Sequence, residues 1–514
     1  GFYQFNYSPA GIYRQNNWVA TMRCPTTKFW GGEVYSKTNR FGRYQAHGTL
    51  EVMYDGAMEN SGFPKKNASL GTKVTGGWDW NVEAGATTVH YTSWKEMMPN
   101  KNVTDRFDQY SKTTNFAGAL AWKDCGMFGA EFDQDDSWGS LRFTPTNLTF
   151  KKSVYAFDGM LISLGSNISA SGAYGDDMIT ATNLFQGIDS EVSGELVVNG
   201  ETMAAGAETK TNDSSADLWM VTPQGTGYFV PKGNDPIIIK HGEQSSPNET
   251  GDNVDDPVTV TAAKAYINHG VKTSGKEYVF VAVPATNATD MAELAAKMAN
   301  KGGEIFEIKA QNEKLHALAY KPAKVTAYSI FTAVDGLNFG RLKSTASEML
   351  LMEKPGVNDK MLSLAISNPN LRPQKDGNDP EGKRWIATPT QTSIVLDGEW
   401  VLNGDAIDGV TITPQSDKTT KIDLTLTEGE PVYIDLVDKD AVGITTVDQS
   451  EQAHVYTAGH DVFVVNAVGT AMVYDVAGQV IKSVDVDGSA RFTLDQQGCY
   501  IVKISDKTVK VVIR

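Results

Sequence analysis

Short runs of apolar and β-branched residues, separated by polar residues and glycine, dominate the chain from about residue 76 onward. Apolar and polar positions alternate within these runs, which is the period of a strand with one buried face. Dipeptides that favour tight turns recur between the runs: Asp158-Gly159, Asn199-Gly200, Asn403-Gly404, Asp408-Gly409 and Asp487-Gly488. The pattern predicts a mainly β protein, with two antiparallel β-sandwich domains over residues 76–440.

One segment has a helical pattern instead. Thr289 and Asp290 are residues that cap helices, and residues 291–300 are good helix formers that end at Gly302-Gly303. Met291, Leu294 and Met298 fall on one face of this helix, which we interpret as a packing stripe.

The two ends of the chain differ from its middle. Residues 1–75 mix aromatic, basic and polar residues with little periodicity, and the composition changes again near residue 440. The alternating runs at 469–480 and 498–504 predict a separate small β unit at 441–514. That unit resembles the C-terminal sorting domains of some exported bacterial proteins.

Charge is unevenly distributed along the 514 residues, whose net charge is −16. Residues 1–75 hold nine Lys and Arg against four Asp and Glu, whereas residues 401–514 hold seventeen acidic against nine basic residues. A basic N-terminal end is suited to an anionic chain, and we expect no nucleic-acid partner because no zinc, RNP or basic-helix motif accompanies it.

Metal and membrane signals are weak. Cys24, Cys125 and Cys499 lack the spacing of a metal site and are expected to be inert thiols. The histidines never show the i, i+4 spacing of a helical zinc site, and no apolar run reaches the roughly 18 residues of a membrane span. The cluster Asp133, Asp135 and Asp136 leaves a structural calcium ion open, although a solvated turn explains it as well. We expect no required cofactor.

Several stretches in order along the chain carry a specific resemblance. They are Gly-Ile-Tyr-Arg-Gln-Asn-Asn-Trp at 11–18, the run from Glu33 to Gly48 that contains Asn39-Arg40-Phe-Gly-Arg43-Tyr-Gln-Ala-His47, Gly-Trp-Asp-Trp-Asn at 77–81 and Gly-Ala-Thr-Thr at 85–88. Together with residues 151–154, 165–168 and 184–186, they resemble the second half of chondroitin ABC lyases, in the polysaccharide lyase group that includes hyaluronate lyases. The resemblance extends to about residue 440.

The resemblance implies a division into domains. Residues 1–75 would be the end of an α/α-toroid catalytic domain, 76–330 a central β super-sandwich and 331–440 a smaller C-terminal β-sandwich, followed by the tail at 441–514. The composition changes at 76 and 440 agree with this division.

The chemistry implied is β-elimination at a uronic acid, with a His and a Tyr for proton transfer, an assisting Arg and a supporting Glu. Arg14 matches the Arg, and its permanently charged planar guanidinium suits a carboxylate or a developing oxyanion. Glu131 is the candidate for the Glu, with a structural carboxylate as the alternative. The family His and Tyr would precede Gly1, so we expect this chain alone to be inactive.

Other residues in the matched stretches are candidates for substrate binding. Arg40, Arg43 and His47 would line a groove for the sulfated sugar, or would serve in packing and salt bridges. Trp78 and Trp80 would stack on pyranose rings, or Trp80 would be a core residue in a domain interface.

The predicted function is therefore part of a lyase that cleaves chondroitin or dermatan sulfate, with hyaluronan as a further candidate. Its partners would be the glycosaminoglycan and an N-terminal half of the same enzyme, and its location would be secreted, periplasmic or at the cell surface. The alternatives are a noncatalytic carbohydrate-binding β-sandwich protein and a surface structural or adhesion module.

Overall fold

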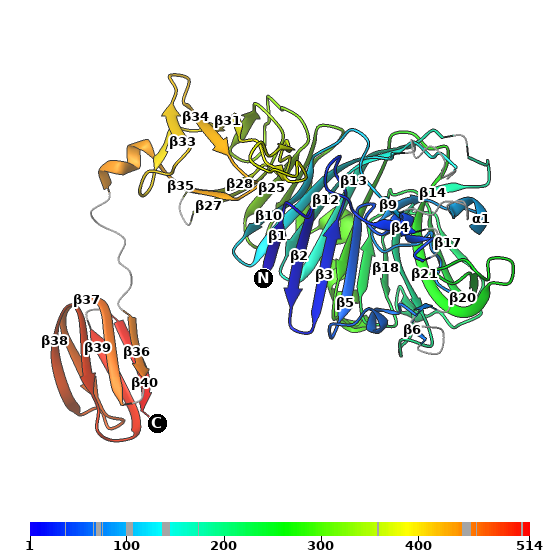
Figure 1. Cartoon of the computed structure of the whole chain (residues 1–514). Helices are drawn as coiled ribbons and strands as arrows, with labels where there is room; N and C mark the ends of the chain where they lie inside the picture. Colours follow the sequence, from blue (N-terminus) through cyan, green and yellow to red (C-terminus); the bar gives the residue numbers. More distant parts are fainter. Residues whose placement is uncertain are drawn as a thin grey trace. The chain divides into compact units, whose positions relative to one another are not determined.

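The computed structural model describes residues 1–35, 38–64, 66–67, 73–74, 76–98, 106–135, 144–172, 174–356, 359–444, 454–458, 460–504 and 507–513. These residues form two compact units, Gly1–Val437 and Asp438–Arg514 (Figure 1). All described strand pairs that position the site are antiparallel, and the predicted mainly β sandwich fold is confirmed.

The N-terminal residues form a sheet in the order β1-β2-β3-β5, drawn in blue in Figure 1. Its strands are β1 (Phe2–Phe5), β2 (Ala10–Gln15), β3 (Trp18–Arg23) and β5 (Thr49–Tyr54). In β3 the side chains of Trp18, Ala20 and Met22 are buried, and the residues between them are half-buried. This alternation is that of a strand, so the helical toroid predicted for residues 1–75 is wrong for the described part of that range.

A long sheet and a second sheet complete the first sandwich. The long sheet has the order β10-β11-β12-β13-β22-β19-β18-β15-β16, and the second has the order β17-β20-β21-β14-β8. The bounds are β8 (Thr87–Val89), β10 (Ala117–Trp122), β11 (Cys125–Asp133), β12 (Leu148–Phe157), β13 (Met160–Ala170), β14 (Ile179–Ile188), β15 (Val197–Val198), β16 (Glu201–Thr202), β17 (Lys210–Asn212), β18 (Leu218–Val221), β19 (Gly227–Val230), β20 (Ile237–Ser246), β21 (Val258–Val271) and β22 (Lys276–Val283).

One continuous apolar core joins these sheets to the N-terminal sheet. Phe2, Tyr13 and Trp18 from the N-terminal sheet pack in the same cluster as Phe128 of β11 and Phe185 of β14. The burial of such large rings is the main force that holds the layers together. Residue 75 is therefore not a domain boundary.

Side chains near the start of the chain meet the free side of β10, the last strand of the long sheet. The amide of Asn6 accepts from Ala119 N (2.7 Å) and donates to Ala119 O (3.1 Å). Gln4 Oε1 accepts from Ala121 N at 2.8 Å, and the Tyr433 hydroxyl donates to Ala121 O at 2.8 Å. The polar backbone groups of both alanines are thus hydrogen-bonded to side chains.

The second sandwich packs against the other face of the long sheet. Its sheets have the orders β23-β24-β25-β27-β28-β35-β32 and β26-β31-β34-β33. The bounds are β23 (Phe306–Gln311), β24 (Leu315–Tyr320), β25 (Val325–Ile330), β26 (Leu342–Thr345), β27 (Met349–Pro355), β28 (Met361–Ser367), β31 (Thr390–Asp397), β32 (Trp400–Leu402), β33 (Val410–Pro414), β34 (Thr419–Leu426) and β35 (Val432–Asp438). Because β23, β24 and β25 belong here, the predicted boundary at residue 330 lies about 25 residues too late.

The predicted helix is present as α2 (Ala288–Lys297). Its N-cap is Asn287, whose side chain accepts from the backbone N–H of Thr289 and Asp290, so the helix starts before the predicted cap. Met291 and Met298 are fully buried in the core between the two sandwiches, which confirms the packing stripe. A further turn, α3 (Ala299–Gly302), follows α2.

Short elements connect the sheets. They are β4 (Glu33–Tyr35) paired with β9 (Arg106–Asp108), β6 (Lys66–Asn67) paired with β7 (Lys73–Val74), β29 (Gln374–Lys375) paired with β30 (Trp385–Ile386), the 3₁₀ turns η1 (Gly42–Tyr44) and η2 (Met58–Ser61), and α1 (Trp94–Met97).

The unit Asp438–Arg514 has a core of its own. It contains the 3₁₀ segment η4 (Lys439–Ile444) and the strands β36 (His454–Ala458), β37 (Asp461–Tyr474), β38 (Val480–Thr493), β39 (Gly498–Ile504) and β40 (Lys507–Ile513). Its strand order is β36-β37-β39-β40, with β38 paired to β37. Across both units, no helix among the described residues has the length and apolar character of a membrane span.

Candidate functional site

Arg14 lies on β2 with its side chain exposed, on the face of the N-terminal sheet that points away from the core. Its backbone pairs with Val19 of β3, and its N–H donates to Gly1 O at 3.0 Å. The exposed rings of Tyr3 and Phe5 on β1 belong to the same sheet. The guanidinium therefore extends into solvent from a strand that is paired on both sides.

Glu131, the other residue predicted as catalytic, lies near the end of β11. Its carboxylate forms an ion pair with Lys151 at 2.9 Å, and about a fifth of its side chain is exposed. The Lys151 ammonium also lies 4.9 Å from the centroid of the Phe331 ring. This geometry is that of a structural ion pair, the alternative that the sequence left open.

The structure does not bring Arg14 and Glu131 together. Phe128, Ala130 and Phe132 of β11 point into the core shared with β2, so Glu131 points to the opposite face of the long sheet. Arg14, in turn, points away from that core. Packed sheets lie about 10 Å apart, so the two side chains are on opposite sides of a double layer.

Arg40 and Arg43 are buried, with 2% and 1% of their surface exposed. Arg40 Nη1 donates to Thr250 O at 3.5 Å, and burial lowers the pKa of Arg40 although the charge of Asp252 opposes this. The Arg43 guanidinium lies 5.4 Å from the centroid of the Tyr91 ring. Both arginines pack inside the chain in this structure and do not line an open groove.

His47 is also buried, with 1% exposed. Its Nε2 lies 2.8 Å from Gln134 Oε1, and its ring packs against Tyr44 and Phe132. Burial lowers the pKa of His47 to about 3, with the Gln134 contact opposing and the Arg43 charge adding to the shift. The ring is thus neutral near pH 7 and enclosed.

Both candidate tryptophans are packed in the core. Trp80 stacks on Phe41 with ring centroids 5.6 Å apart, and its Nε1 donates to Pro247 O at 3.0 Å. The indole of Trp78 donates to Glu83 Oε1 at 3.4 Å. Both rings belong to the core cluster of the first sandwich, so neither offers an open face for sugar stacking.

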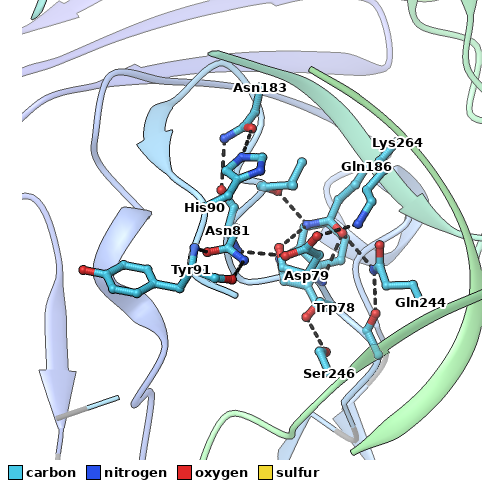
Figure 2. A network of polar contacts seen from close by, with 12 residues as sticks. Trp78, Asp79, Asn81, His90, Tyr91, Asn183, Gln186, Gln244, Ser246 and Lys264 are labelled. Carbon is cyan, nitrogen blue, oxygen red and sulfur yellow. Dashed lines mark hydrogen bonds and ion pairs between the residues drawn. The ribbon is translucent and has the colours of Figure 1, made fainter. Parts of the chain in front are cut away.

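A buried polar network holds the segment Gly76–Tyr91 on the sheet of β14, β20 and β21 (Figure 2). Asp79 forms an ion pair with Lys264 of β21, and its carbonyl accepts from Gln186 Nε2 at 2.8 Å. Gln244 of β20 donates to Gln186 Oε1 at 3.2 Å. Burial raises the pKa of Asp79, but Lys264 and other partners outweigh it, so the net pKa is lowered.

The same network continues through two asparagines (Figure 2). Asn81 donates to Tyr91 O at 3.0 Å and accepts from Tyr91 N at 2.8 Å, which closes the segment into a loop. Asn183 of β14 donates to Asn81 O at 3.1 Å, and its Oδ1 lies 2.9 Å from His90 Nε2. These bonds fix the loop on the sheet, although Gln244 Oε1 is buried without a hydrogen-bond partner.

A carboxylate and a phenol that the sequence reasoning missed lie together on β4. Glu33 and Tyr35 are both half-buried and share one face of the strand, and the Tyr35 hydroxyl donates to the Glu33 carboxylate. The connection before β4 is held by a hydrogen bond from Gly31 N to Gln109 O at 3.0 Å. The spacing of Glu33 and Tyr35 within the matched stretch Glu33–Gly48 was the available signal, since i and i+2 share a face in a strand.

Two further carboxyl groups line a small cavity of about 60 Å³ beside β5. Burial raises the pKa of Glu51 to about 7, although Arg23 opposes the shift. Burial and then the charge of Glu51 raise the pKa of Glu83 as well. The two carboxyl groups thus share a buried site, and nothing in the linear sequence brings residues 51 and 83 together.

Within the described ranges, no group of three or more His, Cys, Asp and Glu is arranged to hold a metal ion. Of the acidic cluster proposed for calcium, Asp133 accepts from the Thr113 hydroxyl at 2.7 Å, and Asp136 lies outside the described residues.

The super-sandwich domain model of polysaccharide lyase family 8 matches residues 1–295, and the chain belongs to this family. The predicted resemblance is thereby confirmed. Because the match begins at residue 1, it also agrees with the strands found in the N-terminal region.

Curated relatives include the chondroitin sulfate ABC endolyase of Proteus vulgaris, 25% identical over 402 residues. A chondroitin sulfate ABC exolyase of Bacteroides thetaiotaomicron is 27% identical over 433 residues. Each alignment covers 78% of this chain, but only 36% and 38% of those relatives. The chain thus spans well under half the length of the relatives it matches.

Solved structures show the same fold. A chondroitinase AC lyase has a TM-score of 0.61 at 16% identity and covers 84% of this chain and 53% of its own. A Paenibacillus xanthan lyase has a TM-score of 0.62 at 14% identity, over 99% of this chain and 49% of its own.

Proposed function

We propose that this chain is part of a glycosaminoglycan lyase that cleaves chondroitin or dermatan sulfate by β-elimination. The observation that carries the proposal is the family match over residues 1–295, together with curated relatives that are chondroitin sulfate ABC lyases. Hyaluronan, which has the same uronate linkage without sulfate, is a further candidate substrate.

The reaction removes the C5 proton of the uronate and breaks the bond between C4 and the bridging oxygen. A base takes the C5 proton, an acid protonates the leaving oxygen, and the electron pair of the C5–H bond becomes the C4=C5 double bond. The uronate carboxylate gains negative charge as the proton leaves, so a fixed cation beside it lowers the barrier.

Two features of this chain suit these tasks. The exposed guanidinium of Arg14 is suited to the uronate carboxylate, and it extends from a strand that holds it in place. The Glu33 and Tyr35 pair is suited to proton transfer, because the phenol already donates to the carboxylate. We assign the supporting carboxylate of the family to Glu33 in preference to Glu131, whose charge is engaged by Lys151.

We further propose that an N-terminal half of the same enzyme supplies the remaining proton-transfer groups and that the enzyme acts outside the cytoplasm. The basic residues at 1–75 support an encounter with a polyanion. The resemblance of the unit after Val437 to sorting domains supports export.

Absorbance of the unsaturated uronate at ultraviolet wavelengths tests the proposal directly. We expect negligible product from residues 1–514 alone and rapid product formation from the enzyme that includes the N-terminal half. Strong activity of residues 1–514 alone would contradict the division of the active site. Binding of chondroitin sulfate without product from either protein would favour the noncatalytic carbohydrate-binding alternative.

A further inference from the structure

A short hairpin of the second sandwich reaches the N-terminal region of the chain. It consists of β29 and β30 with the turn at 376–384 between them. Directly after β30, Ala387 N donates to the Tyr7 hydroxyl at 3.1 Å, and Tyr7 packs edge-on against Phe29. The hairpin is thus anchored to a residue near the start of the N-terminal sheet.

Two ammonium groups lie against one indole ring of this hairpin. Lys28 Nζ is 4.7 Å and Lys375 Nζ is 4.4 Å from the centroid of the Trp385 ring. Each contact is a favourable cation–π interaction, but the two positive charges repel each other. Lys28 comes from the connection between β3 and β4, so the pairing joins distant parts of the chain.

The acidic residues of the hairpin are already engaged by other groups. Asp376 binds the guanidinium of Arg384, with Nε at 2.6 Å. Asp379 accepts from the backbone N–H of Lys383 at 2.7 Å and of Arg384 at 2.6 Å. Glu381 forms an ion pair with Lys383 at 3.0 Å.

As a result, no carboxylate among the described residues forms an ion pair with Lys28 or Lys375. Lys375 donates to Gly382 O at 2.6 Å, which directs its ammonium but leaves the charge uncompensated. Trp30, two residues after Lys28, is 44% exposed, and Tyr7 is 40% exposed. Uncompensated cations beside exposed aromatic rings suit the anionic groups and the apolar ring face of an acidic sugar.

We propose that Lys28, Lys375 and Trp385 form a binding site for a sulfated or carboxylated sugar unit of a glycosaminoglycan chain. The ammonium groups bind the anionic substituents, and the indole edge packs against the pyranose ring. An anion placed between the two lysines also removes their mutual repulsion. The identity of the chain as a glycosaminoglycan rests on the proposed function, whereas the preference for an acidic saccharide rests on the contacts above.

Binding of a chondroitin sulfate hexasaccharide to the whole chain, followed by calorimetry and by tryptophan fluorescence, tests the site. The double variant Lys28→Ala/Lys375→Ala should bind at least about tenfold more weakly at low salt and show a smaller salt dependence. Trp385→Ala should weaken binding and remove part of the fluorescence change. Both variants should unfold at the temperature of the native chain.

Lys383→Ala is the matched control, because Lys383 belongs to the same hairpin and its ammonium is paired with Glu381. It should bind the hexasaccharide as the native chain does. The proposal is overturned if the native chain does not bind the hexasaccharide, if the double variant binds as tightly as the native chain, or if the control is weakened equally. Equal binding of a single-stranded oligonucleotide through the same three residues would overturn the assignment to a sugar.

The lyase assay separates this site from the proposed function. If the variants lose hexasaccharide binding but the enzyme with its N-terminal half forms no unsaturated uronate, the site stands and the lyase proposal fails. If product forms with an unchanged KM in the double variant and the affinity of the whole chain is unchanged, the lyase proposal stands and the site fails.

Discussion

At the scale of single residues, Arg14 is the cation that we propose for catalysis. No carboxylate of the described residues forms an ion pair with the exposed side chain of Arg14. Replacing Arg14 by alanine therefore leaves no carboxylate without its partner. In the enzyme with its N-terminal half, Arg14→Ala should lower turnover on chondroitin sulfate by about two to three orders of magnitude, the effect of losing one preorganised charge. The unsaturated product measures this.

Arg14→Lys should rescue little of that activity, because an ammonium cannot reproduce the planar pair of donors. Arg341→Ala serves as the control, since Arg341 lies in the second sandwich and pairs with Asp397. Near-normal turnover of Arg14→Ala would show that this arginine has no role in the reaction.

The choice between Glu33 and Glu131 is a second test. Glu33→Gln should lower turnover by about a hundredfold or more, because the amide cannot take part in proton transfer with Tyr35. Glu131→Gln should change turnover little, since its loss disrupts a partly exposed ion pair with Lys151. Assays of the two isosteric variants with the same substrate decide the matter, and the opposite order of losses would restore Glu131 as the catalytic carboxylate.

The cavity carboxyls predict an unusual dependence of stability on pH. Burial raises the folded-state pKa of Glu51 from 4.5 to about 7, so the folded chain binds this proton more tightly than the unfolded chain. The stabilisation is complete below about pH 4.5 and is lost as pH rises through about 7. The neighbouring Glu83, the opposing Arg23 and Asp79 are the charged groups that influence this pair.

Glu83→Gln should therefore reduce the fall in the free energy of unfolding between pH 5 and pH 8 by about 1 kcal/mol or more. Urea denaturation at the two pH values measures this difference. Glu201→Gln, on the exposed strand β16, should leave the pH dependence unchanged. An identical pH dependence of the native chain and Glu83→Gln would show that the cavity carboxyls ionise normally.

Residue chemistry alone did not reveal which charged groups are enclosed. A groove for a polyanion would be expected to contain basic residues such as Arg40, Arg43 and His47. In the structure, aromatic rings and backbone carbonyls from distant segments cover these side chains. Arg43 is covered by Tyr91, and Arg40 by the carbonyl of Thr250, which lies 210 positions away in sequence. Such burial depends on the tertiary fold, whereas the exposure of Arg14 follows from strand alternation once the strand is known.

At the scale of elements, the sandwiches after residue 76 were predictable because their apolar positions alternate regularly. The N-terminal strands were not, because their alternation is hidden. In β2 the inward positions include Gly11, while Ile12 lies on the outer face, and in β1 the aromatic Tyr3 and Phe5 are exposed. The hydropathy pattern of such strands is irregular, although β2 pairs with β1 and with β3 in continuous register.

The segment Gly76–Tyr91 gives a test at this scale. Asp79→Asn leaves the Lys264 ammonium without its ion-pair partner, in a site where both side chains are less than 15% exposed. Because the charge is then buried and unpaired, the substitution should lower the free energy of unfolding by about 3–5 kcal/mol. The double variant Asp79→Asn/Lys264→Met should cost less than the sum of the single changes, because it removes both charges.

Denaturant unfolding of the four proteins in this cycle measures the coupling. Because the folded-state pKa of Asp79 is lowered, its stabilisation is present above the unfolded pKa and is lost as the solution is acidified. Additive effects of the two substitutions would show that the ion pair does not hold the loop.

At the scale of the whole molecule, the chain separates after Val437 into two units with separate cores. A chain that ends at Val437 should therefore keep the unfolding temperature and the saccharide binding of the first unit. Calorimetry should resolve two transitions in the whole chain and one in the shortened chain. A fall of several degrees in the first-unit transition would show that the tail stabilises the sandwiches.

The side chains that cover β10 have a consequence for the behaviour of the protein in crowded solution. An uncovered last strand of a sheet is a template on which another copy can add its own strand, which is the first step toward fibrils. Gln4, Asn6 and Tyr433 occupy the donors and acceptors of Ala119 and Ala121 that such a strand would need. These bonds prevent another copy from adding a strand at this edge of the large sheet. Three side chains that are distant in sequence from β10 thus protect the protein against aggregation.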